Sequence, residues 1–275
     1  MKKIPVGIQL YSVRDALKED FCGTLRAVKA LGYDYVEFAG YYGGKSGEEI
    51  RDILAEIGLK APTVHQNPEL FLTEGESAFD FFLAFGVKKI VIPWYPAARL
   101  PGTADWEKTK RDFISLSEAA RKKGLALLYH NHDFEFKQVE GRAVYDLLFE
   151  ELDGYLDPEP DVCWIRYGGA DPVEVIKRYR ERISVVHLKD YLCTGPQDGP
   201  VYGLIGKKEK PDKKKTDGFR LVPLGQGCVD FPAVLSACEE IGAELLIVEQ
   251  DNFTGISPLD GMAQSRRYLA ETFGL

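Results

Sequence analysis

The chain has 275 residues, 45% of them hydrophobic, which is long enough for one large buried core and does not require two domains. It carries 35 basic and 43 acidic residues, a formal charge of −8, and this balance disfavours nucleic acid as a partner because phosphate backbones are bound through lysine and arginine. No stretch approaches the roughly 18 consecutive apolar residues of a membrane helix, so we expect no membrane association.

The start of the chain and its cysteines predict a cytoplasmic protein. Residues 1–10 lead directly into a strand-like run, without the apolar segment and small-residue cleavage site of a signal peptide. The five cysteines are scattered and include no Cys-x-x-Cys pair, which is typical of reduced thiols rather than of a disulfide framework.

Eight short β-branched or aromatic runs alternate along the chain with longer segments of helical period. The predicted strands are residues 6–11, 35–39, 61–65, 89–93, 126–130, 161–164, 184–188 and 245–249. The predicted helices are residues 23–31, 47–57, 76–85, 106–123, 144–152, 172–182, 231–241 and 259–273. Five of these helices are followed by a glycine, as expected for left-handed C-caps: Gly32, Gly58, Gly86, Gly124 and Gly242.

This alternation predicts a parallel sheet, and eight repeats favour its closure into a (β/α)8 TIM barrel, an α/β fold formed by a single domain over residues 1–275. The alternative is an open doubly wound sheet. That fold usually carries a glycine-rich phosphate turn after its first strand, whereas residues 9–14 read QLYSVR.

One connection, the loop of residues 191–230 after the seventh strand, is far longer than the few residues that usually join a strand to a helix. It contains the lysine-rich segments 207–210 and 213–215. A strand-to-helix loop lies on the catalytic face of a barrel, so one interpretation is a lid or an anion contact. The other is a solvated charged excursion.

All four histidines, His65, His130, His132 and His187, fall at or just after the carboxyl ends of predicted strands. These ends form the mouth of a barrel, where active sites are built, whereas histidines used only for packing would also occur on helices. We therefore predict that the histidines belong to a site.

Acidic residues occupy matching places, and four side chains form a candidate metal site: Glu135, Asp161, His187 and Glu249. Divalent ions bind carboxylate oxygens together with one or two imidazoles, and a bound cation would allow several carboxylates to share the mouth of a barrel. A structural ion-pair network with Lys189 and Arg166 is the alternative.

Six segments together resemble the sugar phosphate isomerase/epimerase family of xylose isomerase-like barrels, which includes inosose dehydratase and endonuclease IV-type enzymes. They are residues 7–14 (GIQLYSVR), 129–136 (YHNHDFEF), Asp161 with Trp164 and 169–172 (GADP), 186–190 (VHLKD), 224–227 (LGQG) and 248–251 (VEQD).

The resemblance implies one divalent metal ion (Mn, Mg, Co or Zn), bound by a glutamate after the fifth strand, an aspartate on the sixth, a histidine on the seventh and a glutamate on the eighth. Asp161, His187 and Glu249 match the last three of these ligands. The first departs, because His130 stands where relatives usually have the glutamate. Either His130 or Glu135 is the ligand, and we favour Glu135.

The predicted function is a metal-dependent isomerase or epimerase acting on a sugar, sugar phosphate or keto-sugar through an enediolate. Glu249 or Glu135 is the candidate base, and His130, His132 or Lys189 would assist proton transfer. The predicted substrate-binding residues are Gln9, Glu37, His65, Trp94 and Asn131.

A lyase of the inosose dehydratase or keto-glycoside-cleaving type is the second hypothesis, and a non-catalytic sugar-binding barrel is the third. Endonuclease activity is disfavoured by the acidic charge and by the small number of histidines for a multi-metal site. A carbohydrate is therefore the expected partner, and a homodimer is expected as well.

Overall fold

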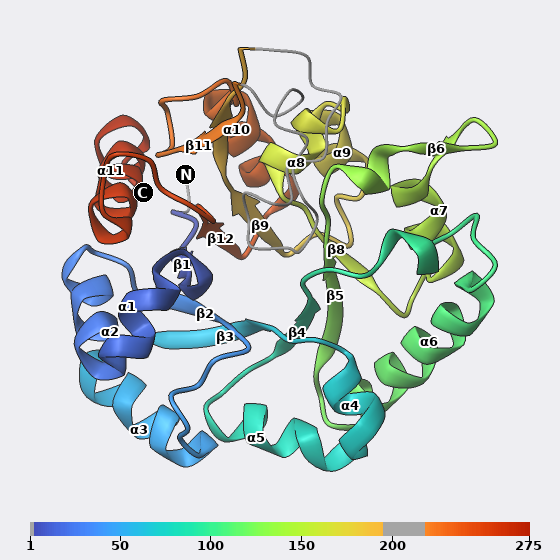
Figure 1. Ribbon diagram of the computed structural model, residues 1–275, viewed down its shortest axis with the longest axis horizontal. Helices are drawn as coiled ribbons and strands as arrows, with labels where there is room; N and C mark the ends of the chain where they lie inside the picture. Colours follow the sequence, from blue (N-terminus) through green and yellow to red (C-terminus); the bar gives the residue numbers. More distant parts are fainter. Residues whose placement is uncertain (1–2, 195–217) are drawn as a thin grey trace.

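The computed structural model describes residues 3–194 and 218–275, and in it eight parallel strands form a nearly closed barrel (Figure 1). Its strands, in chain order, are β1 (Val6–Gln9), β2 (Tyr35–Ala39), β3 (Lys60–His65), β4 (Lys89–Ile92), β5 (Ala126–His130), β8 (Asp157–Glu159), β9 (Val185–Leu188) and β12 (Leu245–Val248). The spatial order is β8-β5-β4-β3-β2-β1-β12-β9. The predicted single-domain TIM barrel is thus confirmed.

The ring of strands is completed between β8 and β9 by one parallel bridge, Asp161 to His187, and by the His187 amide, which donates to the carbonyl of Pro160 at 2.9 Å. A regular ladder is missing between these two strands. The bridge nevertheless brings Asp161 beside His187, which matters for the site.

Helices surround the strands (Figure 1). They are α1 (Arg14–Glu19), α2 (Phe21–Ala30), α3 (Gly47–Ile57), α4 (Glu69–Glu74), α5 (Ala78–Ala84), α6 (Trp106–Lys122), α7 (Val144–Glu151), α8 (Val162–Tyr167), α9 (Pro172–Arg178), α10 (Phe231–Ile241) and α11 (Pro258–Phe273). None of these described helices is long and apolar enough to cross a membrane. All five glycines predicted to end helices have positive φ angles, as expected for left-handed C-caps.

Two apolar layers hold the barrel together. Most buried side chains form one cluster, whereas a second, smaller cluster consists of residues from four strands: Val91, Leu128, Val185, Leu245 and Ile247. Gly7 makes room for this inner layer, because a Cβ there would lie 2.7 Å from Cδ1 of Ile247 and 3.0 Å from Cβ of Tyr35. The inner layer therefore fills the barrel and forms a floor under its mouth.

Side chains two residues apart on a strand point to the same face, so residues that follow the inward-facing apolar ones at this spacing also point into the barrel. His130 lies two residues after Leu128, His187 two after Val185, and Glu249 two after Ile247. The apolar residues that fill the barrel therefore also determine which polar side chains face its axis.

The sixth strand was predicted wrongly. Residues 161–164 do not form a strand, because β8 lies earlier and α8 begins directly after Asp161, which caps this helix. A short, fully apolar run such as residues 162–165 does not distinguish a buried strand from a buried helix by its period. The first strand also ends earlier than predicted, at Gln9, because Leu10–Val13 is a 3-10 helix. The other predicted strands and helices are present, with ends that differ by up to four residues.

Two short pairs of antiparallel strands lie outside the eight-stranded sheet. The first, β6 (Gln138–Val139) with β7 (Arg142–Ala143), precedes α7. The second, β10 (Asp190–Leu192) with β11 (Arg220–Val222), lies within the long loop predicted after the seventh strand. The lysine-rich segments of that loop fall outside the described residues.

The carboxylate of Asp190 anchors the return of this loop. It accepts hydrogen bonds from the backbone amides of Tyr191, Gly225, Gly227 and Val229 at 2.8–3.1 Å. Asp190 is fully buried, so these four amides have replaced its water. It thus holds the loop against the barrel mouth.

Candidate metal centre

Four side chains at the mouth converge as one group, which we call the first cluster: His130, Asp161, His187 and Glu249. One nitrogen or oxygen of each lies within 4.8 Å of those of the others. Nε2 of His130 is 3.3 Å from Oδ2 of Asp161 and 3.6 Å from Oε2 of Glu249, and Nδ1 of His187 is 3.1 Å from Oε2 of Glu249. All four residues are buried. Two imidazoles and two carboxylates form a donor set suited to a divalent transition metal.

Lys189 faces the same carboxylates. Its Nζ lies 3.1 Å from Oδ2 of Asp161, 2.9 Å from Oε2 of Glu249 and 2.9 Å from Oδ2 of Asp251. Burial on its own would lower the pKa of this ammonium, but the three carboxylates raise it well above its usual value, so Lys189 is cationic. One ammonium group does not neutralise three carboxylates, and a further cation fits the remaining charge.

A second group, which we call the second ring, contains Glu37, His65, Glu159 and His187. Nε2 of His65 lies 3.0 Å from Oε1 of Glu37 and 2.8 Å from Oε2 of Glu159. Nε2 of His187 lies 2.9 Å and 3.3 Å from the same two oxygens. Glu159 was not predicted as a site residue. It lies at the end of β8, between two prolines and outside the residues predicted as the sixth strand.

Charges in these two groups shift one another's pKa values. Burial would raise the pKa of Glu37, but His65 and His187 hold it below its usual value. Burial would lower the pKa of His65, and Glu37 and Glu159 instead raise it to about 9. The pKa of Asp161 falls to about 2, against the effect of burial, because Lys189 and His130 lie beside it. Without a bound ion, protons on the imidazoles balance part of the negative charge.

The α8 N-terminus fixes the orientation of Asp161. Its Oδ1 accepts hydrogen bonds from the amides of Cys163 and Trp164 at 2.9 and 3.0 Å, so its Oδ2 is turned toward His130 and Lys189. The Asp161 amide in turn donates to Oδ1 of Asn131 at 3.1 Å. Asn131, predicted to bind substrate, is fully buried and instead holds the backbone of Asp161.

Glu135 lies apart from both groups. Its Oε1 accepts from the hydroxyl of Tyr129 at 2.6 Å and its Oε2 from the amide of His132 at 2.9 Å. Neither group of candidate ligands contains it, whereas His130 is part of the first cluster. The geometry thus places His130, and not the preferred Glu135, beside the other three candidate ligands, because the loop turns the Glu135 carboxylate back toward β5. Burial raises the pKa of Glu135 to about 8.

The mouth contains a cavity of about 360 Å³ beside these ligands. Its lining residues are Tyr11, Ala39, Gly40, His65, Gln66, Asn67, Pro93, Trp94, His130, His132, Lys189, Glu249 and Asp251. His65 and Trp94, both predicted to bind substrate, are among them. Gln9 and Glu37 are not, since Nε2 of Gln9 donates to Oε1 of Glu37 at 2.7 Å and both side chains are fully buried.

His132 differs from the other histidines of the cavity. Its ring stacks between Phe134 and Trp164, at centroid distances of 5.8 and 5.5 Å. Burial, together with the charges of His130 and Lys189, lowers its pKa well below the usual value. His132 is therefore a neutral imidazole that lines the cavity.

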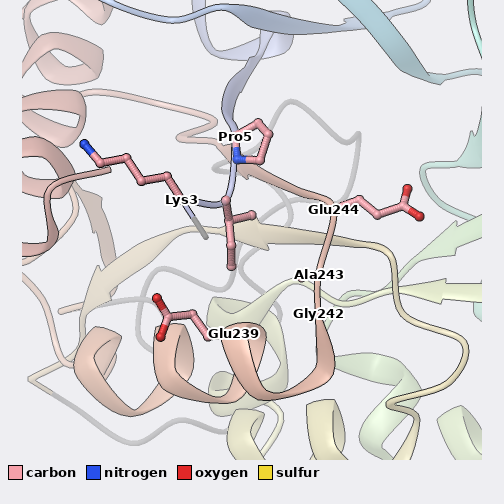
Figure 2. A pocket seen from close by; sticks show the side chains of 7 residues that line it. Lys3, Pro5, Glu239, Gly242, Ala243 and Glu244 are labelled. Atoms are coloured by element: carbon pink, nitrogen blue, oxygen red, sulfur yellow. The ribbon is translucent and has the colours of Figure 1, made fainter. Parts of the chain in front are cut away.

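A second hollow, of about 410 Å³, lies near the amino ends of β1 and β12 and is lined by Lys3, Ile4, Pro5, Glu239, Gly242, Ala243 and Glu244 (Figure 2). Its charged side chains do not converge, and Lys3 and Glu244 extend in opposite directions in Figure 2. It contains no histidine. The convergent donors at the mouth, and not this hollow, therefore define the functional site.

Fold and site together define a barrel enzyme with a buried histidine and carboxylate centre suited to a divalent metal. Residues 25–272 match the model of the xylose isomerase-like TIM barrel family, and the chain belongs to this family. The resemblance noted in the sequence is thereby confirmed.

Individual relatives agree with this assignment. An inosose dehydratase of Clostridium perfringens is 28% identical over 233 residues, which cover 74% of this chain and 72% of the relative. One of Geobacillus kaustophilus is 31% identical over 154 residues, covering 54% of this chain and 47% of the relative. Among solved structures, a sugar phosphate isomerase/epimerase from Parabacteroides distasonis superposes with a TM-score of 0.79 at 23% identity, covering 98% of each chain. This last likeness concerns the fold.

Proposed function

We propose that this enzyme is a divalent-metal-dependent sugar isomerase or epimerase that removes a proton from the carbon next to a carbonyl group. The observation that carries the proposal is the convergence of the first cluster and Lys189 on one cavity of the barrel mouth. A cavity of about 360 Å³ accommodates a monosaccharide-sized polyol.

The first cluster fits a metal ion on the chemistry of its donors. Both ring nitrogens of His130 are buried without a hydrogen bond, which is costly unless the imidazole has another partner, such as a metal ion. His130, Asp161, His187 and Glu249 would hold the ion. When bound, a divalent ion stabilises the negative charge that develops on the substrate oxygens as the proton leaves.

The remaining groups would act on the proton and on the position of the substrate. His132, whose unprotonated ring lines the cavity, would accept the proton from carbon. Lys189 would donate a hydrogen bond to the substrate oxygen that becomes negative. Trp94 and Tyr11 would pack against the apolar face of the sugar, as aromatic rings at cavity walls do.

A dehydratase is the second candidate, and the identities with inosose dehydratases favour it. Both reactions begin with the same proton removal. They diverge afterwards, because an epimerase or isomerase returns the proton to carbon, whereas a dehydratase expels a neighbouring hydroxyl group as water.

Incubation of the metal-loaded enzyme with a panel of keto-sugars in heavy water tests both candidates. We expect deuterium at the carbon next to the carbonyl group, detected by NMR, and a product of unchanged composition, detected by mass spectrometry. A product lighter by one water would replace the first candidate with the second. Binding without deuterium exchange in any sugar would indicate a non-catalytic binding barrel and contradict both.

Two variants test the residues. In Asp161→Asn and His132→Asn, we expect exchange to fall at least 100-fold, in the first with loss of the ion held by the first cluster and in the second with that ion retained. Exchange at the wild-type rate in His132→Asn would assign the proton transfer to another residue. Full metal content and turnover in Asp161→Asn would contradict the assigned metal site.

A further inference from the structure

Four side chains next to the first cluster also form a closed ring of nitrogen and oxygen donors. In this second ring the atoms alternate as Nε2 of His65, Oε1 of Glu37, Nε2 of His187 and Oε2 of Glu159, and the four neighbouring distances run from 2.8 to 3.3 Å. Each imidazole faces both carboxylates, and each carboxylate faces both imidazoles. The four donors thus converge on one centre.

Such a ring has the size of the shell around a transition-metal ion. Ligand bonds of about 2.0–2.1 Å separate the donor atoms of a tetrahedral ion by roughly 3.3 Å. The observed distances equal this value or fall short of it by a few tenths of an ångström.

We propose that the second ring is a second site for a divalent transition-metal ion, which makes the barrel mouth a two-ion centre with His187 shared between the ions. This inference rests on the proposed function, because it takes the first cluster to be the first ion's site. Two imidazoles and two carboxylates suit zinc, cobalt, iron or manganese better than calcium or magnesium, which prefer oxygen ligands alone.

Hydrogen bonds on their own leave this ring incompletely satisfied. If each Nε2 carries a proton, both N–H groups compete for the same two acceptors, Oε1 of Glu37 and Oε2 of Glu159. The other carboxylate oxygens, Oε2 of Glu37 and Oε1 of Glu159, remain buried without a hydrogen bond. Within the described residues of the site, five carboxylates face one ammonium group: Glu37, Glu159, Asp161, Glu249 and Asp251 against Lys189. An ion in the ring would pair with the two carboxylates that Lys189 does not contact.

His187 is placed to serve both ions. Its Nε2 faces Glu37 and Glu159, and its Nδ1 faces Glu249. With both nitrogens committed to metal, the imidazole releases its proton to solvent, as metal binding to a nitrogen requires. Gln9, which donates to Oε1 of Glu37, orients that carboxylate from outside the ring. Access is provided by His65, which lines the cavity.

The test is metal stoichiometry. The full chain is stripped with a chelator, loaded with zinc or cobalt(II), freed of excess ion, and analysed by inductively coupled plasma mass spectrometry. We expect two ions per wild-type chain, one in Glu159→Gln, one in Asp161→Asn and none in the double variant. Glu135→Gln is the matched control, since Glu135 is an equally buried glutamate outside both groups, and it should keep two ions.

The outcomes separate this inference from the proposed function. One ion per wild-type chain, lost in Asp161→Asn and retained in Glu159→Gln, would overturn the second site and leave the first standing. One ion with the reverse pattern would overturn the two-ion centre and also the metal site of the proposed function. No bound ion in the wild type would overturn both. Circular dichroism of each variant shows whether the fold is intact, and anomalous scattering from crystals of the cobalt-loaded wild type locates the ions independently of any variant.

Discussion

Glu135 is a fully buried carboxyl group whose ionisation should be visible in the stability of the protein. Its pKa is raised from an ordinary value of 4.5 to about 8 by burial, so the unfolded chain loses this proton before the folded chain does. The free energy of unfolding contributed by Glu135 is therefore highest below pH 4.5 and falls as the pH rises toward 8.

We expect Glu135→Gln to remove this part of the pH dependence. Between pH 5 and 8, wild-type stability should fall relative to the variant by up to about 4 kcal/mol, since each pKa unit corresponds to about 1.4 kcal/mol. Urea denaturation across this pH range measures the difference. The exposed Glu118→Gln is the control and should run parallel to the wild type. Parallel curves for Glu135→Gln as well would show that Glu135 ionises normally in the folded protein.

The positions of single site residues could be predicted only where the two-residue period of a strand determines the direction of the side chain. His130 and His187 were placed at the mouth because they lie at the carboxyl ends of predicted strands, and in the structure alternation from the apolar residues before them turns their side chains inward. The direction of Glu135 instead depends on a tyrosine hydroxyl and a loop amide, and nothing in its spacing indicates these partners. Glu159 was missed because the predicted strand, residues 161–164, begins four residues after the start of β8, the strand that carries Glu159.

At the scale of elements, the start of α8 links folding to the site. Asp161 caps the helix with one oxygen and faces the metal ligands with the other. Asp161→Asn keeps an acceptor for the cap but removes the charge, whereas Asp161→Ala removes both. We expect Asp161→Ala to be less stable than Asp161→Asn by about 1 kcal/mol, the usual contribution of an N-cap, while both variants lose the ion of the first cluster. Equal unfolding free energies in chelator would show that the cap contributes nothing.

Asp190 performs a comparable task for the loop that returns from β11. Removing its carboxylate leaves four backbone amides without their acceptor, at about 1 kcal/mol or more for each buried group. We expect Asp190→Ala to lose at least about 3 kcal/mol and to show faster hydrogen exchange at Gly225, Gly227 and Val229. Asp171→Ala, which removes an acceptor from a single amide at the start of α9, should lose only about 1 kcal/mol. Unchanged exchange in Asp190→Ala would contradict the anchoring role.

The barrel itself was predictable because it depends on repetition, which a sequence displays directly. Eight strand-and-helix units, with glycines after five helices, specify the architecture even though one strand was assigned to the wrong residues. The closure between β8 and β9 was not predictable, since it consists of one bridge and one hydrogen bond rather than a ladder. Asp161 and His187 lie at this irregular closure between β8 and β9.

The whole molecule concentrates negative charge at one end of its barrel, and this arrangement makes stability depend on a bound cation. Repulsion among the carboxylates opposes folding, so an ion that binds only the folded chain stabilises it by mass action, by about 2.7 kcal/mol at one hundred times the dissociation constant. We expect the melting temperature measured by calorimetry to rise by several degrees on addition of zinc or manganese to chelator-treated protein. Asp161→Asn should lose much of this rise and Glu135→Gln should retain it, because only Asp161 belongs to the first cluster. An equal rise of the melting temperature in both variants would place the stabilising ion elsewhere on the molecule. The negative charge at the barrel mouth would then be balanced by Lys189 and by protons on the imidazoles alone.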